Sequence, residues 1–159
     1  MSAKSDCWQL GPEALKFIQY NLAKGATILE LGSGKGTAVL AQRYHMHSIE
    51  HDPTYLGLHD SNYIYAPLRA GWYCSHMLYG RIPNYDLLLV DGPPSGAGPY
   101  GRAQMIAHIK LFDLTKPVII DDVNRVNELL LATTISANYD SMTIHDEADG
   151  RKFAYVTNS

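Results

Sequence analysis

The segment TILELGSGKGT, residues 27 to 37, decides how this chain is expected to fold. Residues 27 to 31 form a short run rich in apolar and β-branched side chains, which is typical of a buried strand. The run ends abruptly at Gly32, and a helical pattern begins at Thr37 after two further glycines. A strand that passes through a glycine-rich turn into a helix is a usual first unit of an open α/β sheet.

Outside this segment, strand patterns and helix patterns alternate along the chain. This order predicts an α/β fold: a Rossmann-like, doubly wound, mostly parallel seven-stranded sheet with helices on both faces and a C-terminal antiparallel hairpin. The expected helices are a run from Pro12 that stops before Gly25, and residues 37–43, 105–112 and 128–136. The expected strands are residues 27–31, 45–50, 62–66, 85–90, 117–120, 141–145 and 152–157.

Length and composition fit a single domain that spans residues 1–159, with 46% hydrophobic and 18% charged residues. A net charge of −3 argues against binding to nucleic acid by phosphate neutralisation. Residues 1–10 lack the apolar core of a signal peptide, and no stretch is long enough to span a bilayer. Cys7 and Cys74 have no CxxC partner, which favours reduced thiols. We therefore expect a cytoplasmic protein.

The glycine segment can be compared with three kinds of ligand-binding loop. A phosphate-binding P-loop that uses Lys35 would need glycine at position 29 and serine or threonine at position 36, where this chain has Leu29 and Gly36. A dinucleotide fingerprint would need its third glycine at position 37, which is Thr37. A nicotinamide-dependent oxidoreductase is therefore only a distant alternative.

The remaining pattern, acidic-x-Gly-x-Gly-x-Gly from Glu30 to Gly36, resembles motif I of the class I S-adenosylmethionine-dependent methyltransferases. Glycines let the backbone approach the cofactor closely, and Glu30 can act near its cationic aminoacyl end. The resemblance implies that S-adenosylmethionine is the cofactor and that the loop contacts it through Glu30, Gly32, Ser33, Gly34, Gly36 and Thr37.

A second acidic position supports this interpretation. Glu50 ends the expected strand of residues 45–50, eighteen residues after Gly32, where a carboxylate can accept hydrogen bonds from both ribose hydroxyls. His51 follows it. The family often has an acidic residue near the adenine after the third strand, but this chain has Pro67 and Leu68 there. We therefore expect apolar and backbone contacts to the adenine, with Trp72 nearby.

Three aspartates follow the next two strands, namely Asp91 after residues 85–90 and the pair Asp121 and Asp122 after residues 117–120. The carboxyl ends of neighbouring parallel strands lie together, so these carboxylates are expected to converge beside the methyl donor. Three oxygen ligands suit Mg²⁺, which can lower the pKa of a bound hydroxyl while one carboxylate accepts its proton. The three aspartates are therefore the predicted catalytic and metal-binding residues for O-methylation of a hydroxyl acceptor, and Asp91 is also expected to contact the cofactor.

This arrangement resembles the metal-dependent O-methyltransferases, although Pro94 stands where catechol-type enzymes have a lysine. The stretch from residue 85 to residue 128 is more weakly similar to plant glucuronoxylan 4-O-methyltransferase domains. Arg102 and Arg125 follow the acidic loops and are candidates to bind a carboxylate or phosphate of the substrate. The expected acceptor is a small molecule or a saccharide. Little chain is left for a lid, so the acceptor lies in an open cleft or a second subunit of a homo-oligomer supplies the missing wall.

Other interpretations of the same residues stay open at this stage. Asp121 or Asp122 can cap the helix that follows, residues 91–94 can form only a tight turn, and either arginine can be a surface ion-pair partner. A zinc site at His45, His47 and His51 lacks a further ligand at suitable spacing. The same cofactor also serves aminocarboxypropyl transfer and S-adenosylmethionine cleavage, and a non-catalytic binding module keeps the same pocket.

Overall fold

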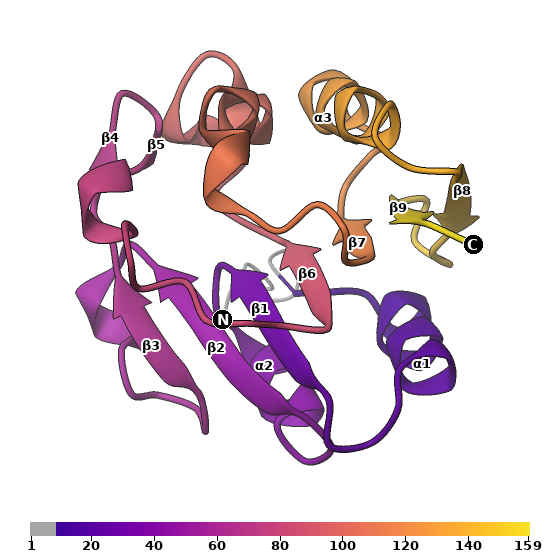
Figure 1. The fold of residues 1–159 in the computed structure, drawn as a ribbon, viewed down its shortest axis with the longest axis horizontal. Coiled ribbons are helices and arrows are strands. Elements are labelled where there is room, and N and C mark those ends of the chain that lie inside the picture. Colours follow the sequence, from indigo (N-terminus) through magenta and orange to yellow (C-terminus); the bar gives the residue numbers. More distant parts are fainter. Residues whose placement is uncertain (1–8) are drawn as a thin grey trace, which may run out of the picture.

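A computed structural model describes residues 9–159, and its central element is one seven-stranded sheet (Figure 1). The α-helices are α1 (Pro12–Asn21), α2 (Lys35–Leu40) and α3 (Val126–Ser136). The sheet strands are β1 (Thr27–Leu31), β2 (His45–Glu50), β3 (Asn62–Tyr65), β6 (Leu87–Val90), β7 (Val118–Ile120), β8 (Ser141–Asp146) and β9 (Lys152–Thr157). Short 3-10 helices cover Pro53–Tyr55, Ser75–Met77 and Ser95–Ala97, and a longer one, η5, covers Gly101–Leu111.

The strand order is β3-β2-β1-β6-β7-β9-β8, and the first five strands are parallel. β9 pairs antiparallel with both β7 and β8, so the last two strands form the edge hairpin. The order reverses between β1 and β6, and ligands of such sheets bind beyond the carboxyl ends of the strands at that point. This architecture confirms the predicted seven-stranded, mostly parallel sheet with a C-terminal hairpin.

Both faces of the sheet are covered, and the side chains of each central strand alternate between two cores. Leu87 and Leu89 of β6 face a cluster that includes Ala14 and Ile18 of α1. Leu88 and Val90 of the same strand face the other cluster, which contains the buried side of α3 and part of η5. Figure 1 shows α1 and α2 on one side of the sheet and α3 on the other. The continuous apolar run of β6 therefore reflects burial on both faces.

Helix boundaries differ from those that the sequence predicts. α2 begins at Lys35 and not at residue 37, because Gly34 is extended and its N–H donates to the hydroxyl of Thr37 at 3.0 Å. The expected helix of residues 105–112 is a 3-10 helix that begins earlier, at Gly101, where φ is +50°. The strands 62–66, 85–90 and 117–120 are each shorter than expected by one or two residues.

A small antiparallel hairpin of β4 (Leu68–Arg69) and β5 (Trp72–Tyr73) is absent from the sequence prediction. Its turn, Ala70 and Gly71, has positive φ at both residues, as a tight two-residue hairpin requires. Alanine rarely adopts this conformation, so the sequence carries little signal for the turn. The hairpin matters because it brings Tyr73 to the carboxyl end of the sheet.

Two further features concern the expectations on compartment. Among residues 9–159 no helix has both the length and the apolar character that crossing a membrane requires. Cys74 is a buried free thiol, and Cys7 lies outside the described residues.

Candidate active site

A pocket of about 720 Å³ lies at the carboxyl ends of β1, β2, β6 and β7. Its size falls in the usual range for binding sites of small molecules and cofactors. Gly32, Ser33, Gly34 and Lys35 of the glycine segment form one wall, and the loops after β6 and β7 form another. The remaining lining residues are Gln9, Glu50, His51, Asp52, Tyr55, Leu58, His59, Tyr73, Asp91, Gly92, Pro94, Arg102, Asp121, Asp122, Arg125 and Arg151.

The glycine segment approaches the loop after β6 closely at Gly32. This residue has φ of +88°, and an added Cβ would lie 3.1 Å from the carbonyl oxygen of Asp91. A side chain at position 32 would therefore be strained and crowded. Gly36, by contrast, does not line the pocket, and a Cβ there would lie 3.3 Å from the Cβ of Leu10. Gly36 serves the packing of α2.

Glu30 lies beneath the loop and does not line the pocket. Its Oε1 accepts hydrogen bonds from the hydroxyls of Thr37 at 2.6 Å and Ser48 at 2.5 Å. Burial raises the pKa of Glu30 to about 7, against the opposing effect of those two hydrogen bonds. Thr37 in turn accepts from the N–H of Gly34, so Glu30 and Thr37 together hold the loop from below.

Glu50 ends β2 and organises the backbone around the pocket. Its Oε2 accepts from the N–H of Ser33 at 3.0 Å, and its Oε1 accepts from the N–H groups of His51 and Asp52 at 2.7 and 2.8 Å. A carboxylate offers about four acceptor positions, so roughly one remains, on Oε2. In this conformation Glu50 can accept one further hydroxyl, whereas the sequence analysis expects it to bind both ribose hydroxyls.

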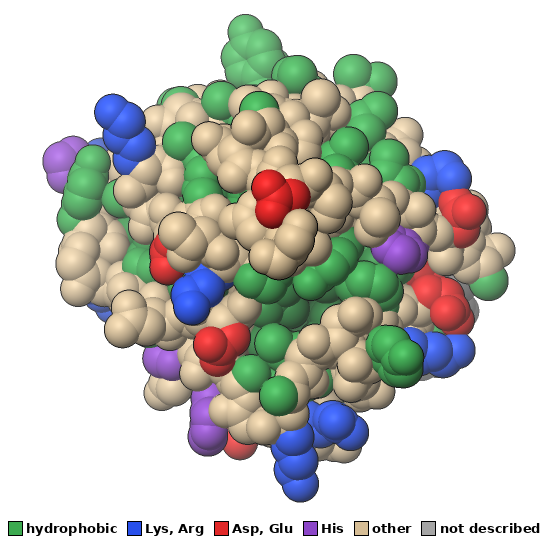
Figure 2. All heavy atoms as spheres, turned by 45° about the vertical axis from the view of Figure 1, so that its right-hand side comes forward, with side chains coloured by type: hydrophobic (Ala, Val, Ile, Leu, Met, Phe, Trp, Pro, Cys, Tyr) green, Lys and Arg blue, Asp and Glu red, His purple; other side chains and the backbone are tan. Residues whose placement is uncertain are grey.

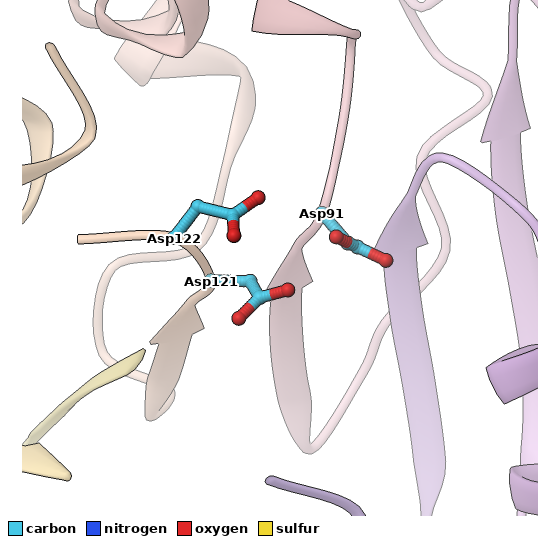
Figure 3. Close-up of side chains that lie close together, drawn as sticks. All are labelled: Asp91, Asp121 and Asp122. Atoms are coloured by element: carbon cyan, nitrogen blue, oxygen red, sulfur yellow. The ribbon is translucent and has the colours of Figure 1, made fainter. Parts of the chain in front are cut away.

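The three aspartates converge as the strand topology predicts. Asp91 extends from the end of β6, and Asp121 and Asp122 extend toward it from the end of β7 (Figure 3). One oxygen of each carboxylate lies within 4.8 Å of the others. Within residues 9–159 no other three His, Cys, Asp or Glu side chains gather in this way, and His45, His47 and His51 do not.

Three oxygens of this acidic cluster are buried without a hydrogen-bond partner, namely both oxygens of Asp121 and Oδ1 of Asp122. Burial and the neighbouring carboxylates raise the pKa of Asp121 to about 6 and that of Asp91 well above its usual value. Asp122 also has a left-handed backbone, with φ of +59°. An aspartate in this conformation with an unpaired buried oxygen is characteristic of a functional site.

Arg102 binds the acidic loops together. Its guanidinium donates to the carbonyl oxygens of Pro93, Asp121 and Asp91 at 3.2, 3.2 and 3.1 Å, and to Oδ2 of Asp122 at 3.1 Å. Only 3% of the residue is exposed, so it is not a surface ion-pair partner. Most of its five N–H donors have acceptors within the protein. Arg102 therefore positions the loops after β6 and β7, and the structure leaves it little capacity to bind substrate.

The pocket has a basic rim that the sequence predicts only in part. Arg125 is partly exposed and contacts Oδ2 of Asp122 at 3.3 Å. Arg151, which the sequence analysis missed, comes from the loop between β8 and β9 and donates to the carbonyl oxygen of Gln9 at 2.6 Å. No local pattern marks Arg151, because the C-terminal hairpin brings it to the pocket from a distant part of the chain.

Tyr73 is a second lining residue that the sequence analysis missed. It is 1% exposed, and its hydroxyl has no hydrogen-bond partner. A Cβ added at Gly92 would lie 2.3 Å from that hydroxyl, which therefore sits directly over the loop after β6. A buried phenol without a partner is costly unless a ligand completes its hydrogen bond.

The residues that the sequence predicts near the adenine can be placed relative to the pocket. Pro67 and Leu68 do not line the pocket. Trp72 is fully buried and stacks on His108 with ring centroids 4.5 Å apart, so it anchors the β4–β5 hairpin instead. The side chains that do line the pocket beyond β2 are Tyr55, Leu58 and His59.

The alternative capping role for the aspartate pair is wrong. The N-cap of α3 is Arg125, and no side chain caps this helix. The oxygens of Asp121 are unpaired, and Oδ2 of Asp122 contacts Arg102 and Arg125. The residues that follow Asp91 do form a close turn, since an added Cβ at Gly92 would lie 3.0 Å from Gly32. That turn aims Asp91 at the pocket.

Comparisons with known proteins support the fold. No protein-family model matches the chain, and neither does any curated protein. Precorrin-6y C5,15-methyltransferase of Geobacter metallireducens superposes with a TM-score of 0.61 at 10% identity over 96% of this chain and 92% of that chain. The E. cuniculi Mtq2–Trm112 complex, which methylates the termination factor eRF1, superposes with a TM-score of 0.58 at 17% identity. The match covers 96% of this chain and 99% of that chain.

The methyltransferase MycE, solved with Mg, S-adenosylhomocysteine and mycinamycin VI, gives a TM-score of 0.56 at 12% identity over 93% of this chain and 50% of that chain. The chain thus has the fold of the class I S-adenosylmethionine-dependent methyltransferases. This finding confirms the fold that the resemblance of the glycine segment implies.

Proposed function

We propose that this protein is an S-adenosylmethionine-dependent methyltransferase that transfers a methyl group to a hydroxyl acceptor with the help of a divalent cation. One observation carries the proposal. Asp121 and Asp122, which carry buried oxygens without a hydrogen-bond partner, line the same pocket as the glycine segment and Glu50. Methyl donor and acceptor can therefore meet within one cleft, which in-line transfer between them requires.

The pocket suits the cofactor through features that the chain already presents. The backbone of Gly32, Ser33 and Gly34 borders the cleft without bulky side chains in the way. The free acceptor position of Glu50 is available to one ribose hydroxyl, and the unpartnered hydroxyl of Tyr73 supplies a further donor or acceptor. We assign cofactor binding to these residues and to His51, with Glu30, Gly36 and Thr37 supporting the loop.

The acidic cluster suits a divalent cation. Carboxylate oxygens that are buried and unpaired are costly in the empty protein, and a hard cation such as Mg²⁺ removes that cost. Asp91, Asp121 and Asp122 would hold it, and its chemistry there would be to lower the pKa of the acceptor hydroxyl. The solved MycE structure contains Mg together with S-adenosylhomocysteine, so this fold accommodates both.

The chain also supplies the groups that orient the acceptor and accept its proton. We assign the acceptance of the acceptor's proton to Asp121, whose carboxylate oxygens have no hydrogen-bond partner in the protein. Arg102 keeps the three aspartates together by one hydrogen bond to each of them. At the rim, Arg125 and Arg151 favour an acceptor that carries a carboxylate or phosphate, such as an acidic small molecule or saccharide.

Calorimetry with S-adenosylhomocysteine tests the cofactor assignment, and failure to bind would overturn the proposal. Mass spectrometry of the products then tests the reaction, since methyl transfer leaves S-adenosylhomocysteine whereas aminocarboxypropyl transfer and cofactor cleavage do not. Measuring turnover in the presence of EDTA separately tests whether the reaction needs a cation. Loss of activity that Mg²⁺ restores is expected, and activity unchanged by EDTA would contradict the cation's role while leaving methyl transfer intact.

A further inference from the structure

Helix α3 (Val126–Ser136) has a second apolar face, which points away from the sheet. Its inward side chains, which include Leu131 and Ile135, are fully buried in the core. The opposite row is exposed: Val126 is 83%, Leu129 39% and Leu130 51% accessible. Together with exposed Thr133, these residues follow the spacing i, i+3, i+4 and i+7, so they form one continuous stripe along the helix.

This outer stripe carries no charge. Glu128 is the only charged residue of α3, and it is buried, with Oε1 3.5 Å from the backbone N–H of Arg102. A surface helix of a globular protein normally has charged residues on its outer face, and a helix that is apolar all round is normally covered on all sides. The outer face of α3 therefore has the composition of an interface.

The apolar surface extends from the helix to the edge of the sheet. Ile144 of the edge strand β8 is 46% exposed. Met142, two residues earlier on the same strand face, packs into the core cluster that contains Leu131 and Ile135 of α3. Ile144 therefore lies on the α3 side of the sheet. Figure 2 turns the side of the molecule that carries α3 and β8 forward and shows hydrophobic side chains exposed on it.

We propose that a second copy of this chain packs on the α3 stripe, defined as Val126, Leu129, Leu130 and Thr133, to form a two-fold symmetric homodimer. An uncharged stripe packs against itself without repulsion, which a two-fold interface requires because the same patch serves both subunits. The stripe lacks the lysines and arginines by which a protein binds nucleic acid or an anionic membrane surface.

The charges at the two ends of α3 favour the same arrangement. A two-fold axis across the stripe sets the two helices antiparallel, so the start of one helix lies near the end of the other. Arg125 precedes α3 and is partly exposed. Exposed Asp140 follows the last residue of α3 by four positions, and its Oδ2 accepts from the backbone N–H and the hydroxyl of Ser159. Each Arg125 then approaches Asp140 of the second copy. It also approaches the C-terminal end of α3 in the second copy, which is the negative end of that helix dipole. Parallel helices would instead place the two arginines together.

The α3 stripe is smaller than the area that a stable dimer buries. A stable dimer buries roughly 800 Å² on each partner, and an eleven-residue helix is about 16 Å long. The stripe alone covers only part of that area, so the interface includes the edge of the sheet at Ile144. The stripe begins next to Arg125, which lines the pocket. The second copy therefore lies near this edge of the pocket.

Sedimentation of the full chain over a wide range of concentration tests the dimer directly and needs no cofactor, so its outcome is independent of the proposed activity. Wild type is expected to show a dimer mass. Leu130→Glu is expected to weaken dimerisation roughly thirty-fold or more while its circular dichroism stays unchanged. Tyr20→Glu, at a 90% exposed position on α1, is the matched control and is expected to remain dimeric.

A charge exchange tests the orientation and remains informative even if Leu130→Glu fails to fold. Arg125→Glu and Asp140→Arg are each expected to weaken the dimer several-fold, and the double variant to restore it. A wild type that sediments as a monomer at every concentration overturns the proposal. A folded Leu130→Glu variant that dimerises as wild type does also overturns it. Lack of rescue by the double variant overturns the antiparallel arrangement.

Discussion

Two groups of buried carboxylates lie on either side of the same pocket, and their hydrogen bonding differs. Glu30 and Glu50, beneath and beside the glycine segment, accept five hydrogen bonds between them from backbone and hydroxyl groups. Asp121, at the end of β7, accepts none, and Asp122 has one oxygen unpaired. Partnered carboxylates stabilise a loop, whereas unpartnered ones destabilise the empty protein. The difference indicates that Glu30 and Glu50 stabilise the glycine segment, whereas Asp121 and Asp122 are suited to bind a ligand.

The largest expected effect is on turnover. We expect Asp121→Asn to lower kcat by roughly 10²- to 10⁴-fold, because it removes the proton acceptor and a cation ligand. Calorimetry should find S-adenosylhomocysteine affinity nearly unchanged, since Asp121 has no part in the glycine segment. Asp146→Asn, on the exposed end of β8, is the control and should leave kcat unchanged. Similar turnover in both variants would remove Asp121 from the reaction.

The next effect concerns cofactor affinity. Glu50→Gln should weaken S-adenosylhomocysteine binding roughly ten- to hundredfold, because an amide replaces a carboxylate that holds three backbone N–H groups and one free acceptor position. Calorimetry measures the change, with exposed Glu13→Gln as control. If Glu50→Gln and Asp121→Asn change affinity equally, the division of roles between the two groups is wrong.

The third expected effect is a pH dependence of the free energy of unfolding, and it arises from Glu30. Its folded-state pKa of about 7 lies above the ordinary value of 4.5, so the folded protein holds this proton more tightly than the unfolded chain does. The resulting stabilisation is fully present below pH about 4.5 and is lost as the pH rises through about 7. It amounts to on the order of 3 kcal/mol, from the size of the pKa shift.

Glu30→Gln should remove this dependence, because glutamine keeps the acceptor oxygen and cannot ionise. Denaturant unfolding at pH about 5 and about 8 measures the free energy of unfolding of both proteins. Wild type should lose stability relative to the variant at the higher pH. A difference between the two proteins that does not change with pH would contradict a raised pKa at Glu30.

The smallest expected effect is on cofactor affinity, and it is tested by removing two tyrosine hydroxyls in turn. Tyr73→Phe should weaken S-adenosylhomocysteine binding by about two- to tenfold and leave stability nearly unchanged, because its hydroxyl has no partner in the protein. Tyr139→Phe should do the opposite, because its hydroxyl donates to the carbonyl oxygen of Lys116 at 2.7 Å, away from the pocket. Unchanged binding in Tyr73→Phe would exclude this hydroxyl from the cofactor site.

The parts of the fold and site that the sequence predicts are those with a local signal. The glycines of residues 32–36 mark the end of β1, and continuous apolar runs mark β6 and β7 as strands buried on both faces. Because parallel strands align their carboxyl ends, this order alone brings Asp91, Asp121 and Asp122 together. The acidic cluster was thus predictable from topology, without any knowledge of side-chain contacts.

The missed residues depend on tertiary contacts. Tyr73 reaches the pocket through a hairpin with two residues in each strand, whose turn places Ala70 at a φ of +51°. Arg151 comes from the loop between the last two strands. The role of Arg102 is set by carbonyl groups from two separate loops, so its charge and its position after an acidic loop suggested only substrate binding or a surface ion pair. The sequence did not predict the exposed apolar stripe of α3, because which side chains of an apolar helix are exposed depends on tertiary packing.

Thermal unfolding of wild type and Asp121→Asn, each in EDTA and in Mg²⁺, tests most directly whether the unpartnered carboxylates are kept for a ligand. In EDTA the variant should be at least as stable as wild type, because the substitution removes a buried charge from a repulsive cluster. Mg²⁺ should then raise the unfolding temperature of wild type and have little effect on the variant. A variant that is clearly less stable than wild type in EDTA, with no response of wild type to Mg²⁺, would contradict the account.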